Sequence, residues 1–168
     1  MRKLLTVFFG LAVGCQATTV FTVTFSPATV SGAPGDMLSF FGTLTNNTAN
    51  TEYINSDSFT LAGGIPVDDS PFLTNAPLSL GPSASTASFL FLTVTIPNGQ
   101  TPADYAGTFD VIGGQDGGNG TAQDDLGEGL FTVTVTSSVP EPASVLLSIT
   151  GLLALALLRR KWPKLHQN

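Results

Sequence analysis

The chain has 168 residues, a formal net charge of -6 and a single cysteine, which excludes an intrachain disulfide. All six Lys and Arg residues lie near the two termini, so residues 18–138 contain no Lys, Arg, His or Cys but hold 11 of the 12 acidic residues. A segment without cations cannot neutralise phosphates, which excludes nucleic-acid binding, and without imidazole, amine or thiol groups it lacks the usual general bases and nucleophiles.

The first 17 residues have the organisation of a secretory signal peptide, with basic residues at positions 2 and 3, an apolar stretch over 4–13 and a small-residue end. Ten apolar residues make a helix about 15 Å long, too short to cross a hydrocarbon core of about 30 Å. We therefore predict export, with signal peptidase cleaving after Ala17. The residues up to Cys15 loosely resemble a lipoprotein box, so lipidation of Cys15 is an alternative outcome of the same signal.

Residues 18–138 are predicted to form one exported domain, because polar and apolar residues alternate in short runs separated by Pro, Gly and Asn. The alternation predicts strands at 20–25, 37–45, 89–96, 105–112 and 130–136, and weaker ones at 52–54 and 58–61. Thr, Val and Phe dominate these runs, which favours strands over helices. The fold class is therefore predicted as all-β, an antiparallel immunoglobulin-like β-sandwich of about seven strands. Residues 34–47 also resemble the B-strand region of many bacterial surface immunoglobulin-like modules.

Residues 113–129, between the last two predicted strands, are rich in glycine and acids and are predicted to form a loop. Hard oxygen ligands of this kind suit Ca²⁺, and the candidate ligands are Asp116, Asn119, Asp124 and Asp125. Their spacing does not match an EF-hand, and a calcium-binding nonapeptide would need several copies. A flexible, solvated loop without a metal is the other interpretation, and no other cofactor is predicted.

A second acidic pair, Asp68-Asp69, is flanked by prolines and is predicted to lie in a solvated turn. Adjacent carboxylates do not predict the separation that glycoside hydrolysis requires, so no catalytic residue is predicted and we do not expect an enzyme. Tyr53 and Tyr105 are the only aromatic candidates for a carbohydrate contact in the exported part. Asn46 begins a short match to the glycosylation acceptor pattern, which we discount for an expected bacterial protein.

The C-terminal segment, residues 139–168, has three parts in order: the triplet Pro140, Glu141 and Pro142, an apolar run over 143–158, and a basic cluster that begins with Arg159, Arg160 and Lys161. Sixteen helical residues span about 24 Å, which predicts a short single transmembrane helix. The positive-inside rule places residues 159–168 in the cytoplasm and 18–138 outside. The two prolines hold the triplet extended, a suitable shape for a peptidase groove, although a plain membrane anchor is the alternative.

This combination resembles the PEP-CTERM protein-sorting domain of exopolysaccharide-producing Gram-negative bacteria. The resemblance covers about 25 residues and places the family's motif on Pro140, Glu141 and Pro142. It implies recognition by an exosortase, an integral-membrane cysteine protease thought to process the tail and to release or transfer the protein to the cell surface or extracellular matrix. The tail after Lys161 is longer than the family's usual ending.

We therefore expect an exported surface or extracellular-matrix protein with a structural or adhesive role in an exopolysaccharide-associated matrix. Its expected partners are signal peptidase, an exosortase-type membrane protease and, through divalent cations, an anionic exopolysaccharide. The alternative is an immunoglobulin-like recognition module for a glycan or protein ligand, dependent on Ca²⁺ if the acidic segment binds the ion. A carboxylate hydrolase, the third hypothesis, would need two acids converging in a pocket.

Overall fold

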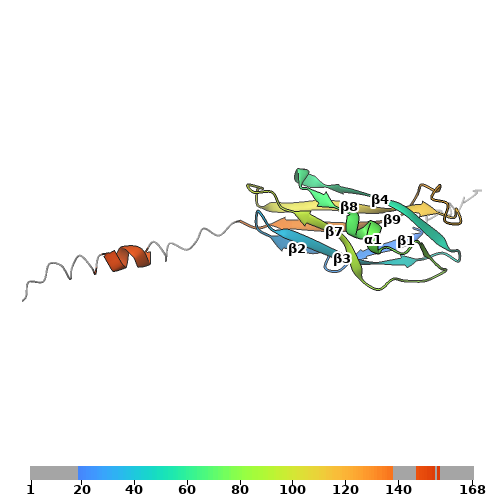
Figure 1. Cartoon of the computed structure of the whole chain (residues 1–168), viewed down its shortest axis with the longest axis horizontal. Coiled ribbons are helices and arrows are strands. Elements are labelled where there is room, and N and C mark those ends of the chain that lie inside the picture. The colour runs from blue at the N-terminus through green and yellow to red at the C-terminus, as the bar shows by residue number, and fades with distance from the viewer. Residues whose placement is uncertain (1–18, 138–146, 154, 156–168) are drawn as a thin grey trace, which may run out of the picture.

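The computed structural model describes residues 19–137, 147–153 and 155, and within residues 19–137 nine strands form two packed sheets (Figure 1). The first sheet has the order β1-β3-β7-β5, with β1 at Phe21–Phe25, β3 at Met37–Asn46, β5 at Val67–Asp68 and β7 at Phe89–Thr95. The second has the order β2-β9-β8-β4-β6, with β2 at Thr29–Gly32, β4 at Glu52–Leu61, β6 at Ser79–Leu80, β8 at Ala103–Gly114 and β9 at Asp124–Val135. Apart from β6, which follows β5 in the chain, these orders correspond to strands A-B-E-D and A′-G-F-C of immunoglobulin-like domains, which confirms the predicted sandwich.

The predicted strands are confirmed, with three differences. The two weak predictions at 52–54 and 58–61 form one strand, β4, which continues across a bulge between Ile54 and Ser56. The short strands β2, β5 and β6 were not predicted, and β2 pairs in parallel with β9 whereas the other strand pairs of the described domain are antiparallel. The predicted loop at 113–129 is too long, because β8 runs to Gly114 and β9 already begins at Asp124.

Two glycines of β9 allow β1 to pack directly against it. A Cβ atom on Gly127 would lie 2.2 Å from the carbonyl oxygen of Phe21, and one on Gly129 would lie 2.6 Å from Cγ1 of Val23. Both separations are shorter than van der Waals contact, so a side chain at either position would push the strands apart. The glycines of this segment therefore make room inside the sandwich, and the start of β1 lies beside the start of β9.

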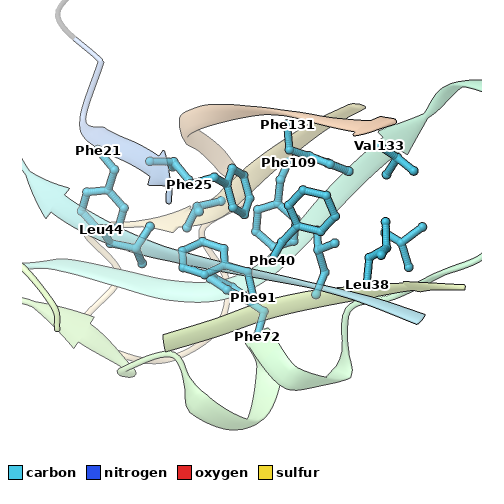
Figure 2. Close-up of a cluster of buried hydrophobic side chains, with 14 of the residues drawn as sticks. Phe21, Phe25, Leu38, Phe40, Leu44, Phe72, Phe91, Phe109, Phe131 and Val133 are labelled. Carbon is cyan, nitrogen blue, oxygen red and sulfur yellow. The ribbon is translucent and has the colours of Figure 1, made fainter. Parts of the chain in front are cut away.

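The core is a cluster of phenylalanine rings contributed by both sheets (Figure 2). Its buried members alternate with polar residues along each strand, as on β1, where Phe21, Val23 and Phe25 point inward. The ring of Phe25 packs edge-to-face against that of Phe91 at 5.2 Å, and Phe40 and Phe131 lie 4.9 Å apart across the two sheets. Aromatic pairs at such distances add to the stabilisation that comes from burying their area.

A short helix, α1 at Ser70–Asn75, follows β5 and closes one side of the sandwich (Figure 1). Pro71 lies in its first turn, and Phe72 is fully buried. The ring of Phe72 lies 5.1 Å from Phe91 of the first sheet and 4.9 Å from Phe109 of the second. Since this one side chain contacts both sheets, α1 is held in place chiefly by Phe72. A 3-10 turn at Ala62–Gly64 precedes β5.

The predicted targeting elements fall largely outside the described residues. The signal peptide at 1–17, the triplet Pro140–Glu141–Pro142 and the basic cluster Arg159–Arg160–Lys161 all lie there. Residues 147–153, inside the predicted apolar run, are helical. In the parts of the chain that the structure describes, no helix is both long and apolar enough to cross a membrane.

Candidate functional site

The acidic connection between β8 and β9 is organised around the carboxylate of Asp116. Its Oδ2 accepts hydrogen bonds from the backbone N–H of Thr121 (2.7 Å), from the backbone N–H of Ala122 (3.0 Å) and from Nδ2 of Asn55 on β4 (2.9 Å). Its Oδ1 accepts from the N–H of Gly118 at 2.9 Å. These donors favour the ionised form, so the hydrogen bond from Ala122 and the others together lower the pKa of Asp116 to about 2.

The four calcium candidates are not brought together by this geometry. The side-chain amide of Asn119 donates to the carbonyl oxygen of Asp116 at 2.9 Å, while Asp124 and Asp125 lie on β9, paired with Gly113 and Ile112. Among the residues that the structure describes, no three His, Cys, Asp or Glu side chains are grouped so that they could hold a metal ion. The Asp116 carboxylate instead binds the backbone of its own loop.

Replacing Asp116 with asparagine is expected to loosen residues 115–123 and to remove their response to acid. Because the folded carboxyl has the lower pKa, its stabilising effect is present above its ordinary value of 3.8 and is lost as the pH falls through about 2. Hydrogen exchange at the amides of Thr121 and Ala122 would measure the change. Asp125→Asn is the control, since it removes the same charge from β9 outside the loop. Equal amide protection in the wild type and Asp116→Asn at pH 5 would contradict the assignment.

The two tyrosines singled out in the sequence are partly buried against the protein's own loops. The hydroxyl of Tyr105 donates to the carbonyl oxygen of Thr101 at 2.8 Å, and its ring covers Gly63, where a Cβ would lie 2.4 Å from the ring. The ring of Tyr53 lies over Gly118, 3.2 Å from the position of a Cβ there. Both rings therefore pack against neighbouring glycines, and a sugar would have to share them with these contacts.

Asn46, at the end of β3, forms a buried polar centre that the sequence did not reveal. The residue is 0% exposed. Its Nδ2 donates to the carbonyl oxygens of Asn50 (2.8 Å), Leu80 (3.0 Å) and Gly81 (3.0 Å). Its Oδ1 accepts from the backbone N–H and the hydroxyl of Thr48, both at 2.9 Å. Asn46 thus joins the β3–β4 turn to the end of β6, and its amide is not accessible as a glycosylation acceptor.

The first residue of β4, Glu52, extends this centre toward the acidic loop. It is 3% exposed, and its Oε1 accepts from Nε2 of Gln115 at 2.9 Å and from the hydroxyl of Thr48 at 3.3 Å. Buried polar groups need such partners, since an unpaired one costs about 1–3 kcal/mol. These side chains are therefore occupied in connecting the turn, the strand and the loop.

Two carboxyl groups from distant parts of the sequence meet where α1 approaches β4. Asp57 lies in the middle of β4, and Asp69 immediately precedes α1. Oδ2 of Asp57 is buried, and no N–H or hydroxyl group of the described residues donates a hydrogen bond to it. Burial, then the charge of Asp69 and a hydrogen bond with its side chain, raise the pKa of Asp57 to about 7. The prediction that Asp68-Asp69 lies in a solvated turn is therefore right in part: Asp68 is exposed but lies in β5, and Asp69 is partly buried.

A small hollow of about 100 Å³ lies between α1 and the beginning of β4. Its lining is mixed in polarity and comprises Ile54, Asn55, Ser56, Phe72, Leu73, Ala76, Pro77 and Leu78. Asp57 follows the lining residue Ser56 in the chain, and Asp69 immediately precedes α1, but neither residue lines the hollow. Pockets for small molecules usually enclose about 300–1,000 Å³, so this hollow is too small for most substrates.

Comparisons with known proteins yield distant structural likenesses. No protein-family profile matches the chain, and no curated protein matches it. Among solved structures, an MSP family member from C. elegans is 11% identical, with a TM-score of 0.38 over 71% of this chain and 100% of that one. The CARDB domain of a Pyrococcus furiosus protein is 18% identical, with a TM-score of 0.40 over 70% of this chain and 94% of that one. A human PapD-like domain is 13% identical, with a TM-score of 0.37 over 83% of this chain and 100% of that one. The fold assignment therefore rests on the sheet order and register of this chain itself.

Proposed function

We propose that this protein is an exported, non-enzymatic β-sandwich module that a PEP-CTERM-type signal delivers to the cell surface or extracellular matrix, where its role is structural or adhesive. The observation that carries the proposal is the order of the chain. The chain begins with the expected export signal and continues with a sandwich that contains no cation. It ends with a Pro-Glu-Pro triplet, an apolar run and a basic cluster. Each basic cluster lies at the end of a segment expected to enter a membrane.

The interior of the module supports a structural role. Its buried polar side chains, Asn46 and Glu52, bind other groups of the same chain, and the Asp116 carboxylate accepts hydrogen bonds from its own loop and from Asn55. The hollow beside α1 is small. An exported module with an acidic surface remains soluble through its net charge, and divalent cations would bridge it to an anionic polysaccharide.

The strongest feature in favour of an enzyme is the pair Asp57 and Asp69, because two neighbouring carboxyl groups serve as acid and base in many hydrolases. Here the carboxyl group is only partly buried, no N–H or hydroxyl group donates to its buried Oδ2 among the described residues, and the neighbouring hollow has a volume of only about 100 Å³. We therefore assign the pair to the structure of the module and not to catalysis.

The sorting proposal is tested by the mass of the form that cells release. In an exopolysaccharide-producing Gram-negative host that carries an exosortase, we expect the released protein to lack both the N-terminal signal and the residues beyond the Pro-Glu-Pro triplet. Replacing Glu141 with alanine should leave nearly all of the protein in the membrane fraction. Glu128→Ala, which removes an exposed glutamate from β9, is the matched control and should be processed normally. Release of a form with an intact C-terminus would refute the proposal.

A further inference from the structure

Asp57 is an inward-pointing carboxyl group on a strand with a largely open edge. On one side β4 pairs with β8 from Tyr53 to Leu61, while on the other β6 covers only Glu52 and Tyr53. Asp57 lies opposite Val111, which is fully buried, and residues directly opposite each other in an antiparallel pair share a face of the sheet. The carboxyl group is therefore directed between the two sheets, at the side that α1 closes.

No cation balances this carboxyl group within the exported domain, because residues 18–138 contain no Lys, Arg or His. From the start of α1 it meets the carboxyl group of Asp69. From β8 it meets the apolar Val111, while the next carboxyl group of that strand, Asp110, belongs to the outer face with its partner Glu128. Asp68 on β5 is exposed and accepts hydrogen bonds from the hydroxyl and backbone N–H of Ser70. Asp69 is thus the titratable group that Asp57 faces.

We propose that a proton shared by Asp57 and Asp69 holds α1 against the open side of the sandwich, and that loss of this proton loosens α1. With one proton present, a neutral carboxyl group can donate to a carboxylate. Without it, two like charges meet in a partly buried place that has no counterion, which is unfavourable. Asp57 is fixed in β4 by its pairing with β8, whereas Asp69 belongs to the short segment that enters α1. The repulsion is therefore relieved by movement of α1.

Loosening of α1 would withdraw Phe72 from its contacts with Phe91 and Phe109, and would open the hollow beside β4. The sign of the pH dependence follows from the raised pKa of Asp57. The closed form, with α1 in place, binds the proton more tightly than the open form. It is therefore favoured most below pH 3.8, the ordinary pKa of an aspartate. This advantage is lost as the pH rises to about 7, and it stays lost above that value. The helix is thus held most firmly in acidic solution and loosens as the pH approaches neutrality.

The proposal is tested by hydrogen exchange in the full chain, purified in a mild detergent, between pH 5 and pH 8. The amides of Phe72 and Ala76, which donate within α1, report its opening. After correction for the pH dependence of intrinsic exchange, protection in the wild type should fall by up to about tenfold per pH unit as far as pH 7, and then level off. In Asp57→Asn, where nothing titrates at this position, protection should not vary with pH.

Asp68→Asn is the matched control, because it removes a neighbouring carboxylate whose hydrogen bonds with Ser70 lower its pKa. It should keep the wild-type profile. Wild-type protection that does not change between pH 5 and pH 8, or a wild-type slope retained in Asp57→Asn, would overturn the proposal. Since Asp57→Asn could fail to fold, the carboxyl carbon of Asp57 should also be titrated by NMR in the wild type. A midpoint near 7 supports the proposal, and one near 3.8 overturns it.

Discussion

Replacing Asn46 with leucine is expected to destabilise the domain by about 3–5 kcal/mol, a large effect for one side chain. Leucine has a similar shape but no polar atoms. Three carbonyl oxygens, of Asn50, Leu80 and Gly81, would lose their donor at a site that is 0% exposed in the wild type. Thr48 would lose its acceptor as well. Urea denaturation of the full chain, followed by far-ultraviolet circular dichroism, would measure the loss.

The neighbouring residue supplies the control for this prediction. Asn47 is exposed, and its side chain donates to the carbonyl oxygen of Thr19 and to the hydroxyl of Thr22. Water can replace these contacts, so Asn47→Leu should cost about 1 kcal/mol or less. Equal effects of the two substitutions would show that the buried centre around Asn46 does not determine the stability of the turn.

Replacing Phe91 with alanine is expected to cost about 3–5 kcal/mol, the range found when a buried phenylalanine is truncated. Phe91 is fully buried at the centre of the ring cluster (Figure 2). Its ring lies 5.2 Å from Phe25, 5.1 Å from Phe72 and 5.4 Å from Phe109. The cavity would therefore affect both sheets and the anchor of α1 at once. The same denaturation experiment applies, and lower amide protection in α1 should accompany the loss of stability.

Two controls separate the packing of Phe91 from its hydrophobicity. Phe91→Leu keeps most of the buried volume and should cost about 1.5 kcal/mol or less. Phe41→Ala removes an identical side chain from the outer face of the first sheet, where it is 44% exposed, and should cost about 1 kcal/mol or less. If Phe41→Ala were as harmful as Phe91→Ala, the assignment of the inner and outer faces of the first sheet would be wrong.

Sequence alternation predicted most of this fold because the inner and outer faces of each strand differ so clearly. On β1 and β9 the residues that alternate with Thr are the buried ones, so the pattern alone indicated both the strands and their inner faces. The same reasoning could not find β2, β5 and β6, which have two to four residues each. Strands so short contain too few alternations to define a period.

Glycine misled the prediction at the start of β9. In a sequence, the glycines of residues 113–129 indicate turns, because glycine is depleted in strands. In the folded domain, Gly127 and Gly129 lie in a strand and provide the space into which β1 packs. The distinction depends on a partner strand more than a hundred positions earlier in the chain, so no local window contains it.

The polar sites also depend on contacts between distant residues. Asp57 meets Asp69 because the chain turns back between β4 and α1, and Asn55 binds Asp116 across 61 positions. The sequence offered one usable signal, an acidic residue within a run that otherwise alternates as a strand, at position 57 between the predicted segments 52–54 and 58–61. An acid on the inner face of an edge strand also discourages pairing with another chain.

The parallel pairing of β2 with β9 determines how this domain carries mechanical load. The chain enters at Phe21, beside Gly127, and leaves β9 at Val135, at the opposite end of the sandwich. Tension applied between these two ends acts along the strands. The bonds from Thr132 N–H to the Ala28 carbonyl and from Thr136 N–H to the Gly32 carbonyl, each 2.8 Å, would therefore be sheared together and not peeled apart one at a time. A domain tethered at its C-terminal end and pulled from the other would resist extension through its hydrogen-bond pattern alone.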